Sequence, residues 1–91
     1  MYELVPTKNF KKGLKRYRHE KKTLFNLRKV LNCLQKGVSL PAKYRDHNLR
    51  GRRADYRECH VRPDLLLVYY VEEAEKRIYL QEIGSHSEIF G

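Results

Sequence analysis

Three of the four histidines and one aspartate are the residues of this sequence best suited to moving protons. His47, His60 and Asp64 lie in the middle of the chain, within DHNLRGRRADYRECHVRPD, and His86 lies near its end, within GSHSEIF. Imidazole has an unperturbed pKa near neutrality, so it can give or accept a proton at cellular pH. These four residues are therefore the candidate acid–base groups.

Arginines surround the candidate acid–base groups in the sequence. Guanidinium groups bind phosphates through paired, planar hydrogen bonds. A site that combines imidazoles with guanidinium groups is suited to moving protons around a phosphodiester. The candidate phosphate-binding residues are Arg50, Arg52, Arg53, Arg57 and Arg62, and the ring of Phe90 can either stack on a base or pin the C-terminus to the core.

The net charge of the chain points to a polyanionic partner. The formal charge is +9 and the pI is about 9.8, which fits binding to nucleic acid, to an acidic protein, or to both. Residues 8–29 carry ten Lys or Arg and a single acid, Glu20. The N-terminal half and the arginines of the middle should therefore form a basic face.

Metal, thiol and membrane chemistry are not expected. Three histidines and a carboxylate suit zinc or iron, but Pro63 keeps His60 and Asp64 off a common helix face, so we predict no metal. Cys33 and Cys59 are too far apart for a CxxC pair, and we expect reduced thiols in a cytoplasmic protein. The longest apolar run, residues 65–71, is far shorter than the roughly 20 residues that cross a bilayer.

Hydrophobic spacing predicts two helices near the N-terminus. Phe10, Leu14 and Tyr17 recur at helical spacing, which predicts a helix capped by Thr7 that runs to about residue 20. A leucine repeat over residues 24–34 predicts a second helix, capped by Thr23 and stopped by Gly37. The two helices should form a hairpin. His19, among basic helix residues, is expected to be a bystander.

Alternation and turn residues predict the strands. Residues 2–6 suggest an edge strand because of Pro6, and residues 38–44 a loop. Residues 53–61 alternate, with Tyr56, Glu58 and His60 on one side and Arg57 and Cys59 on the other, so Cys59 should lie in the core. Residues 65–71 are apolar on both faces of an extended strand, which predicts a central strand. Its tyrosines should pack rather than recognise a ligand. Residues 76–83 predict a last strand.

These elements predict one domain over residues 1–91. The order βααβββ is typical of an α+β fold in which an antiparallel-rich sheet packs against a helical hairpin on one face. The sequence does not fix the strand order. If the strand that carries His60 and the strand before His86 both lie near the centre, the two imidazoles reach the same edge of the sheet.

Three motifs resemble the YafQ branch of the RelE/ParE superfamily of bacterial type II toxins. They are DHNLRG at residues 46–51, YRECHVRPDLLLVY at residues 56–69 and GSHSEIF at residues 84–90. The resemblance implies a small twisted antiparallel sheet with an N-terminal helical hairpin. It also implies a metal-independent mRNA endoribonuclease, an mRNA interferase without cofactor, which inhibits translation by cutting message on the ribosome. A cognate acidic antitoxin encoded beside it would hold it inactive.

The resemblance also assigns site residues. The family's functional histidines fall on His47, His60 and His86, its carboxylate on Asp64 and its terminal aromatic residue on Phe90. Two departures stand out: Leu65 replaces a frequent tryptophan, and Gln81 and Glu82 stand where an arginine is common. The cation that stabilises the transition state is therefore left open, with Arg57 and Arg62 as candidates.

Two other functions stay open at this point. A ParE-like toxin would inhibit DNA gyrase without cutting RNA, and would halt replication while message stays whole. A plain basic nucleic-acid-binding module would show salt-sensitive binding without turnover.

Overall fold

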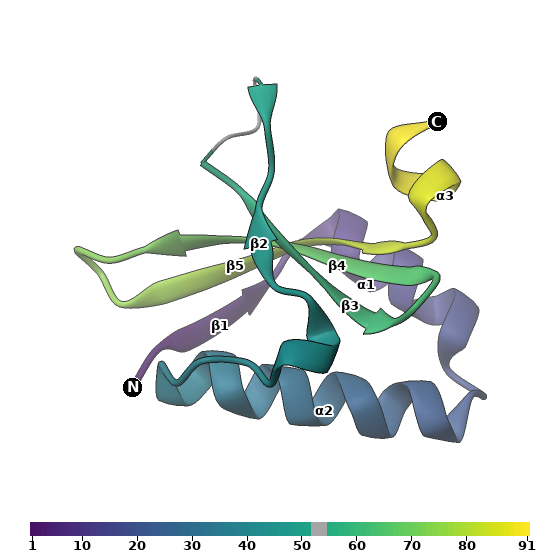
Figure 1. Ribbon diagram of the computed structural model, residues 1–91, viewed down its shortest axis with the longest axis horizontal. Helices are drawn as coiled ribbons and strands as arrows, with labels where there is room; N and C mark the ends of the chain where they lie inside the picture. The colour runs from purple at the N-terminus through teal and green to yellow at the C-terminus, as the bar shows by residue number, and fades with distance from the viewer. Residues whose placement is uncertain (52–54) are drawn as a thin grey trace.

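A five-stranded sheet forms the centre of the computed structural model, which describes residues 1–51 and 55–91 (Figure 1). The order across the sheet is β1-β5-β4-β3-β2; β1 pairs parallel with β5, and the other neighbours pair antiparallel. The strands are β1 (Glu3–Pro6), β2 (His47–Asn48), β3 (Arg57–Arg62), β4 (Leu65–Glu72) and β5 (Arg77–Gly84). The predicted α+β class, the edge position of β1 and the central position of β4 are confirmed.

Helices precede and follow the strands. Helix α2 runs along one face of the sheet, and α3 stands on the opposite side, at the end of β5 (Figure 1). The helical elements are α1 (Lys8–Leu14), the 3-10 turn η1 (Lys15–Tyr17), α2 (Lys21–Lys36), the 3-10 turn η2 (Ala42–Tyr44) and α3 (His86–Phe90). None of the helices in these described ranges is both long and apolar enough to cross a membrane.

The core lies between the sheet and the N-terminal helices. Leu65, Leu67 and Tyr69 of β4 alternate into it and meet side chains such as Phe10 and Val30. The intervening Leu66 and Val68 are buried as well, on the other face. Burial on both faces explains why β4 is a continuous apolar run.

Cys59 lies in this core, as predicted, and its side chain is fully buried. Burial raises the pKa of its thiol far above the ordinary value, so the thiolate does not form at neutral pH. Cys59 therefore has no role as a nucleophile.

The helix boundaries differ from the predicted ones in two places. The first α-helix ends at Leu14 and continues only as a 3-10 turn to Tyr17. Residues 18–22 are all polar or charged, so a longer helix would gain no stability from packing against the core. The predicted cap at Thr23 is wrong: α2 begins at Lys21, and the Thr23 side chain is buried in its first turn, donating to Glu20. Gly37 ends α2 as predicted, in the left-handed conformation at φ 72°.

Two short elements were not predicted. Strand β2 has only two residues and α3 only five, too few for a periodic pattern to be visible in the sequence. The strand predicted over residues 53–61 is found as β3, Arg57–Arg62.

Gly13 allows α1 to touch the backbone of β5. A Cβ atom at residue 13 would lie 2.3 Å from the carbonyl oxygen of Ile83. We therefore expect Gly13→Ala to destabilise the protein by about 1–3 kcal/mol, the usual cost of overpacking. In an unobstructed helix the same change would stabilise by about 1 kcal/mol. Urea unfolding measures the sign, with Lys12→Ala, an exposed neighbour in α1, as control; a more stable Gly13→Ala variant would contradict the close packing.

Candidate active site

His60 projects from β3 on the face of the sheet away from the core. Its neighbours Cys59 and Val61 are buried core residues, and alternation directs the imidazole to the opposite side. The ring Nδ1 lies 3.2 Å from the carbonyl oxygen of Pro63. Because a carbonyl only accepts, this contact places the proton on Nδ1. In the neutral ring, Nε2 is then left with its lone pair and can accept a proton.

His47 on β2 lies beside His60 and is held from both sides. Its Nδ1 lies 2.7 Å from the carbonyl oxygen of Arg45, and its Nε2 lies 2.9 Å from Oε1 of Glu58. Both partners are oxygen acceptors, so each ring nitrogen of His47 faces one of them. The ring centroids of His47 and His60 are 6.2 Å apart.

Glu58 is a member of the site that the sequence reasoning missed. It is only 8% exposed, and its Oε2 atom is buried without a hydrogen-bond partner among the described residues. The signal was available, since the alternation of β3 puts Glu58 and His60 on the same face. The other carboxylate oxygen of Glu58, Oε1, is the atom that contacts the His47 ring.

Strand register brings His86 to the same end of the sheet as His60. His60 pairs with Leu66, and Leu66 pairs with Gly84, two residues before His86. Neighbouring strands are about 4.8 Å apart, so the backbones of His60 and Gly84 are separated by about 10 Å. His86 opens α3 with an exposed side chain, and its ring centroid lies 5.0 Å from that of Phe90.

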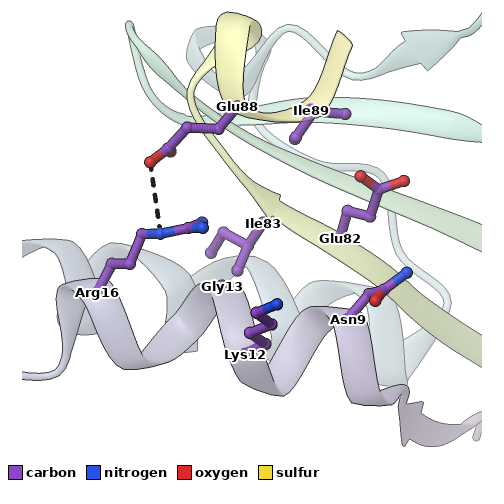
Figure 2. Close-up of a pocket in the computed structure, with 8 residues that line it drawn as sticks. All are labelled: Asn9, Lys12, Gly13, Arg16, Glu82, Ile83, Glu88 and Ile89. Carbon is purple, nitrogen blue, oxygen red and sulfur yellow. Dashed lines mark ion pairs between the residues drawn. The ribbon is translucent and has the colours of Figure 1, made fainter. Parts of the chain in front are cut away.

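Glu88 fixes α3 to the N-terminal part of the chain. Its Oε1 accepts hydrogen bonds from the Ser85 backbone N–H at 2.7 Å and from the Tyr17 hydroxyl at 2.9 Å. Its Oε2 lies 3.6 Å from Nε of Arg16 (Figure 2). Ser85 returns the contact by accepting from the Glu88 N–H, which completes a capping box. The spacing Ser-x-x-Glu was the signal for this helix.

Two of the predicted phosphate-binding arginines are engaged elsewhere. Arg57 points to the core side of the sheet, where it forms an ion pair with Asp46 at 2.7 Å. Arg62 forms one with Glu20 on the approach to α2, also at 2.7 Å. Strand alternation thus keeps Arg57 on the other face of the sheet from the histidines. Arg62 lines a pocket together with His60, but its guanidinium group is paired with Glu20.

The remaining predicted residues lie at the edges. Asp64 is exposed in the turn between β3 and β4; its one ion-pair neighbour among the described residues is Arg62, at 4.0 Å, and no contact joins it to a histidine. Arg50 is exposed just after β2. Arg52 and Arg53 lie outside the described residues.

A partly buried network of hydrogen bonds holds β2 against the sheet. The Tyr69 hydroxyl donates to Asp46 at 2.5 Å, and Arg57 donates to Tyr69, to Asp46 and to Asn48 of β2. Burial, and then the hydrogen bond to Asp46, raise the pKa of Tyr69 above its ordinary value. Asp46 directly precedes His47, so this network fixes the backbone from which the His47 ring extends.

Comparison with known proteins decides the family. Residues 2–91 match the family model described as the bacterial toxin of type II toxin-antitoxin system, YafQ. The chain belongs to the YafQ toxin family. The expected resemblance and the expected fold are therefore confirmed.

Relatives with assigned names cover nearly the whole chain. The mRNA interferase toxin YafQ of Escherichia coli K12 is 32% identical over 85 residues, which are 93% of this chain and 87% of that protein. A metal-bound toxin from Helicobacter pylori is 41% identical, with a TM-score of 0.85 over 99% of this chain and all of the other. The E. coli DinJ-YafQ complex contains a chain 28% identical, with a TM-score of 0.85 and full coverage of both chains.

The contacts of Glu88 lead to a prediction for this YafQ-family toxin. The Ser85 N–H, followed by the Tyr17 hydroxyl, lowers the pKa of Glu88 below its ordinary value. A lowered pKa means that the carboxylate stabilises the folded helix above the ordinary glutamate pKa, and that this contribution is lost as the pH falls through the lowered value. We expect the NMR signals of Ser85 and Ile89 to shift towards random-coil positions over that range.

Variants of Glu88 separate its hydrogen bonds from its charge. Glu88→Gln keeps an acceptor oxygen and should retain helix α3 through the acid range, while Glu88→Ala should lose it at every pH. Glu3→Ala, which removes an exposed ion pair with Arg77, serves as the control. Native α3 signals in Glu88→Ala at pH 7 would contradict the assigned anchor.

Proposed function

We propose that this chain is an mRNA endoribonuclease, an mRNA interferase that cuts translated message on the ribosome and so inhibits translation in the bacterial cytoplasm. The observation that supports this most is the register His60–Leu66–Gly84, which brings two histidine-bearing segments to one end of the sheet. The name of the E. coli relative supports the same activity. The reaction needs one group to accept a proton and another to give one, on opposite sides of a phosphate.

His60 is the proposed general base. Its Nδ1 contact with Pro63 leaves Nε2 as the acceptor, so this nitrogen takes the proton of an RNA 2′-hydroxyl. The resulting 2′-oxygen attacks the adjacent phosphorus. Asp64, the other candidate base in the sequence, lies in the solvent-exposed turn, and His60 is preferred because of its position on the sheet.

His86 is the proposed general acid. As the bond between phosphorus and the 5′-oxygen breaks, His86 gives its proton to that oxygen. The products are a 2′,3′-cyclic phosphate, which can open to the 3′-phosphate, and a 5′-hydroxyl end. Phe90, whose ring adjoins that of His86, is placed to stack on a base next to the leaving oxygen.

Charge on the phosphoryl oxygens needs a cation that is not already committed. Arg57 and Arg62 each form a close ion pair, which makes them weak candidates. Arg50 is exposed two residues after β2, the strand that carries His47, and the ring of His47 is held next to that of His60. We assign phosphate stabilisation to Arg50, Arg53 and His47.

A cognate acidic antitoxin is the proposed protein partner. The E. coli relative has been solved in complex with the antitoxin DinJ. In this chain the basic residues of 8–29 cover the N-terminal helices. An acidic segment that folds on binding is complementary to that surface.

Alanine substitution tests the two histidines. We expect His60→Ala and His86→Ala each to reduce the cleavage rate of a defined message by about 10²–10⁴-fold, with unchanged far-UV circular dichroism, because each removes one proton transfer. His19→Ala is the matched control, since His19 is exposed and contacts only Arg18 among the described residues. Full activity in either test variant would refute its role.

A modified RNA substrate and the ends of the cleaved RNA test whether the 2′-hydroxyl is the attacking group. A single 2′-deoxy substitution at the scissile nucleotide should abolish cutting, because no 2′-oxygen remains to attack. Cleavage should persist in the presence of a chelator. Mapped 5′-hydroxyl ends are expected for message that is being translated, and parallel reactions with and without ribosomes measure how far cleavage depends on the ribosome. Intact message accompanied by arrested replication would instead support a gyrase-directed toxin.

A further inference from the structure

Three tyrosines form a row across the sheet, on the face away from the core. The ring centroid of Tyr70 lies 5.7 Å from that of Tyr56 and 6.4 Å from that of Tyr79. The three residues come from adjacent segments: β5, β4, and the chain just before β3. Each side chain is partly exposed to solvent.

Alternation along β4 puts the row on the same face as His60. Leu65, Leu67 and Tyr69 point into the helix-covered core, so Leu66, Val68 and Tyr70 point the other way. Leu66 pairs with His60, and Tyr70 lies four residues further along the strand, about 13 Å away at 3.3 Å per residue. Helix α2 covers the opposite side of the sheet (Figure 1).

We propose that Tyr56, Tyr70 and Tyr79 form a stacking subsite for bases of single-stranded RNA, a few nucleotides from the phosphate that is cut. Aromatic side chains displayed on a sheet bind unpaired bases by stacking, which tolerates any base because every base has a flat face. The subsite rests on the proposed function, since it takes nucleotides of the same message. This proposal gives Tyr70 a role beyond the packing that the sequence predicts.

Charge next to the row fits this ligand. The Leu49 N–H donates to the Tyr56 carbonyl at 2.9 Å, so the exposed Arg50 follows directly after the residue that is paired with the first tyrosine of the row. A guanidinium group there can hold the backbone phosphate of a stacked nucleotide. The combination of rings in a line and a cation at their edge is the arrangement that single-strand binders use.

The alternative explanation is that the rings only stabilise the sheet. Cross-strand aromatic pairs do so, and the same tyrosines adjoin Val68, which is completely buried on this face. The two explanations differ in what replaces the ring. A leucine keeps apolar cover over the sheet but cannot stack on a base, whereas a phenylalanine keeps both.

A fluorescent base tests the subsite directly. Short RNAs that carry one 2′-deoxy nucleotide at the cleavage position are not cut, and 2-aminopurine placed at successive positions loses fluorescence where it stacks. We expect quenching by the wild-type protein at positions on one side of the scissile phosphate. Tyr70→Phe should behave like the wild type, and Tyr70→Leu should lose that quenching and bind on the order of 5- to 150-fold more weakly.

Control variants keep the test decisive. Tyr2→Leu removes a partly buried tyrosine that packs on the core side, and should leave quenching unchanged. Tyr79→Leu repeats the test on β5 in case Tyr70→Leu fails to fold, which circular dichroism reports. The measurements are made with free RNA and with message bound to ribosomes.

The outcomes separate this subsite from the proposed function. Tyrosine-dependent quenching without cleavage of unmodified RNA would keep the subsite and refute the nuclease. Cleavage together with wild-type affinity and quenching in folded Tyr70→Leu and Tyr79→Leu, on free and ribosome-bound message, would refute the subsite alone. Neither quenching nor cleavage by the wild-type protein would refute both.

Discussion

The pairing register of β3, β4 and β5 is the constraint on which the rest of the structure depends. Leu66 of β4 connects β3 with β5, because it pairs with His60 on one side and with Gly84 on the other. A shift of one residue would turn the inward side chains of β4 outward. In β5 the buried Ile78 and Leu80 alternate with the partly exposed Tyr79 and Gln81, and this alternation opposes such a shift. The hydrophobic core therefore also determines which histidine-bearing segments lie at the same end of the sheet.

The segments that carry the other site residues are too short to be stable alone. A two-residue strand and a five-residue helix gain little from their own hydrogen bonds. Each is held by a carboxylate: Asp46, through Tyr69 and Arg57, fixes β2, and Glu88, through Ser85 and Tyr17, fixes α3. Asp46 thus fixes the segment that carries His47, and Glu88 fixes the helix that carries His86.

The elements that could be predicted are those whose burial is visible as a pattern of apolar residues in the sequence. Seven apolar residues in a row indicated the central strand, and Pro6 indicated an edge. The β2 strand and α3 helix escaped because their positions depend on side-chain hydrogen bonds from distant segments, which periodicity does not record. Residue type also does not show which of the candidate arginines already form ion pairs. Strand alternation already placed Arg57 on the other face of β3 from His60. The sequence does not show that Asp46 forms an ion pair with Arg57, or that Glu20 forms one with Arg62.

The pairing of these arginines bears on how the proposed site would carry positive charge. Gln81 and Glu82 stand where an arginine is common in the family that the sequence resembles, and Glu82 lines a pocket with Lys12 and Arg16 instead (Figure 2). The ring of His47 offers a substitute, since Glu58 and the Arg45 carbonyl hold it beside His60. This ring sits on a short side chain with few rotatable bonds, whereas an arginine would have to reach the phosphate on a long and flexible one. In the proposed reaction Glu58 therefore acts by positioning the ring of His47.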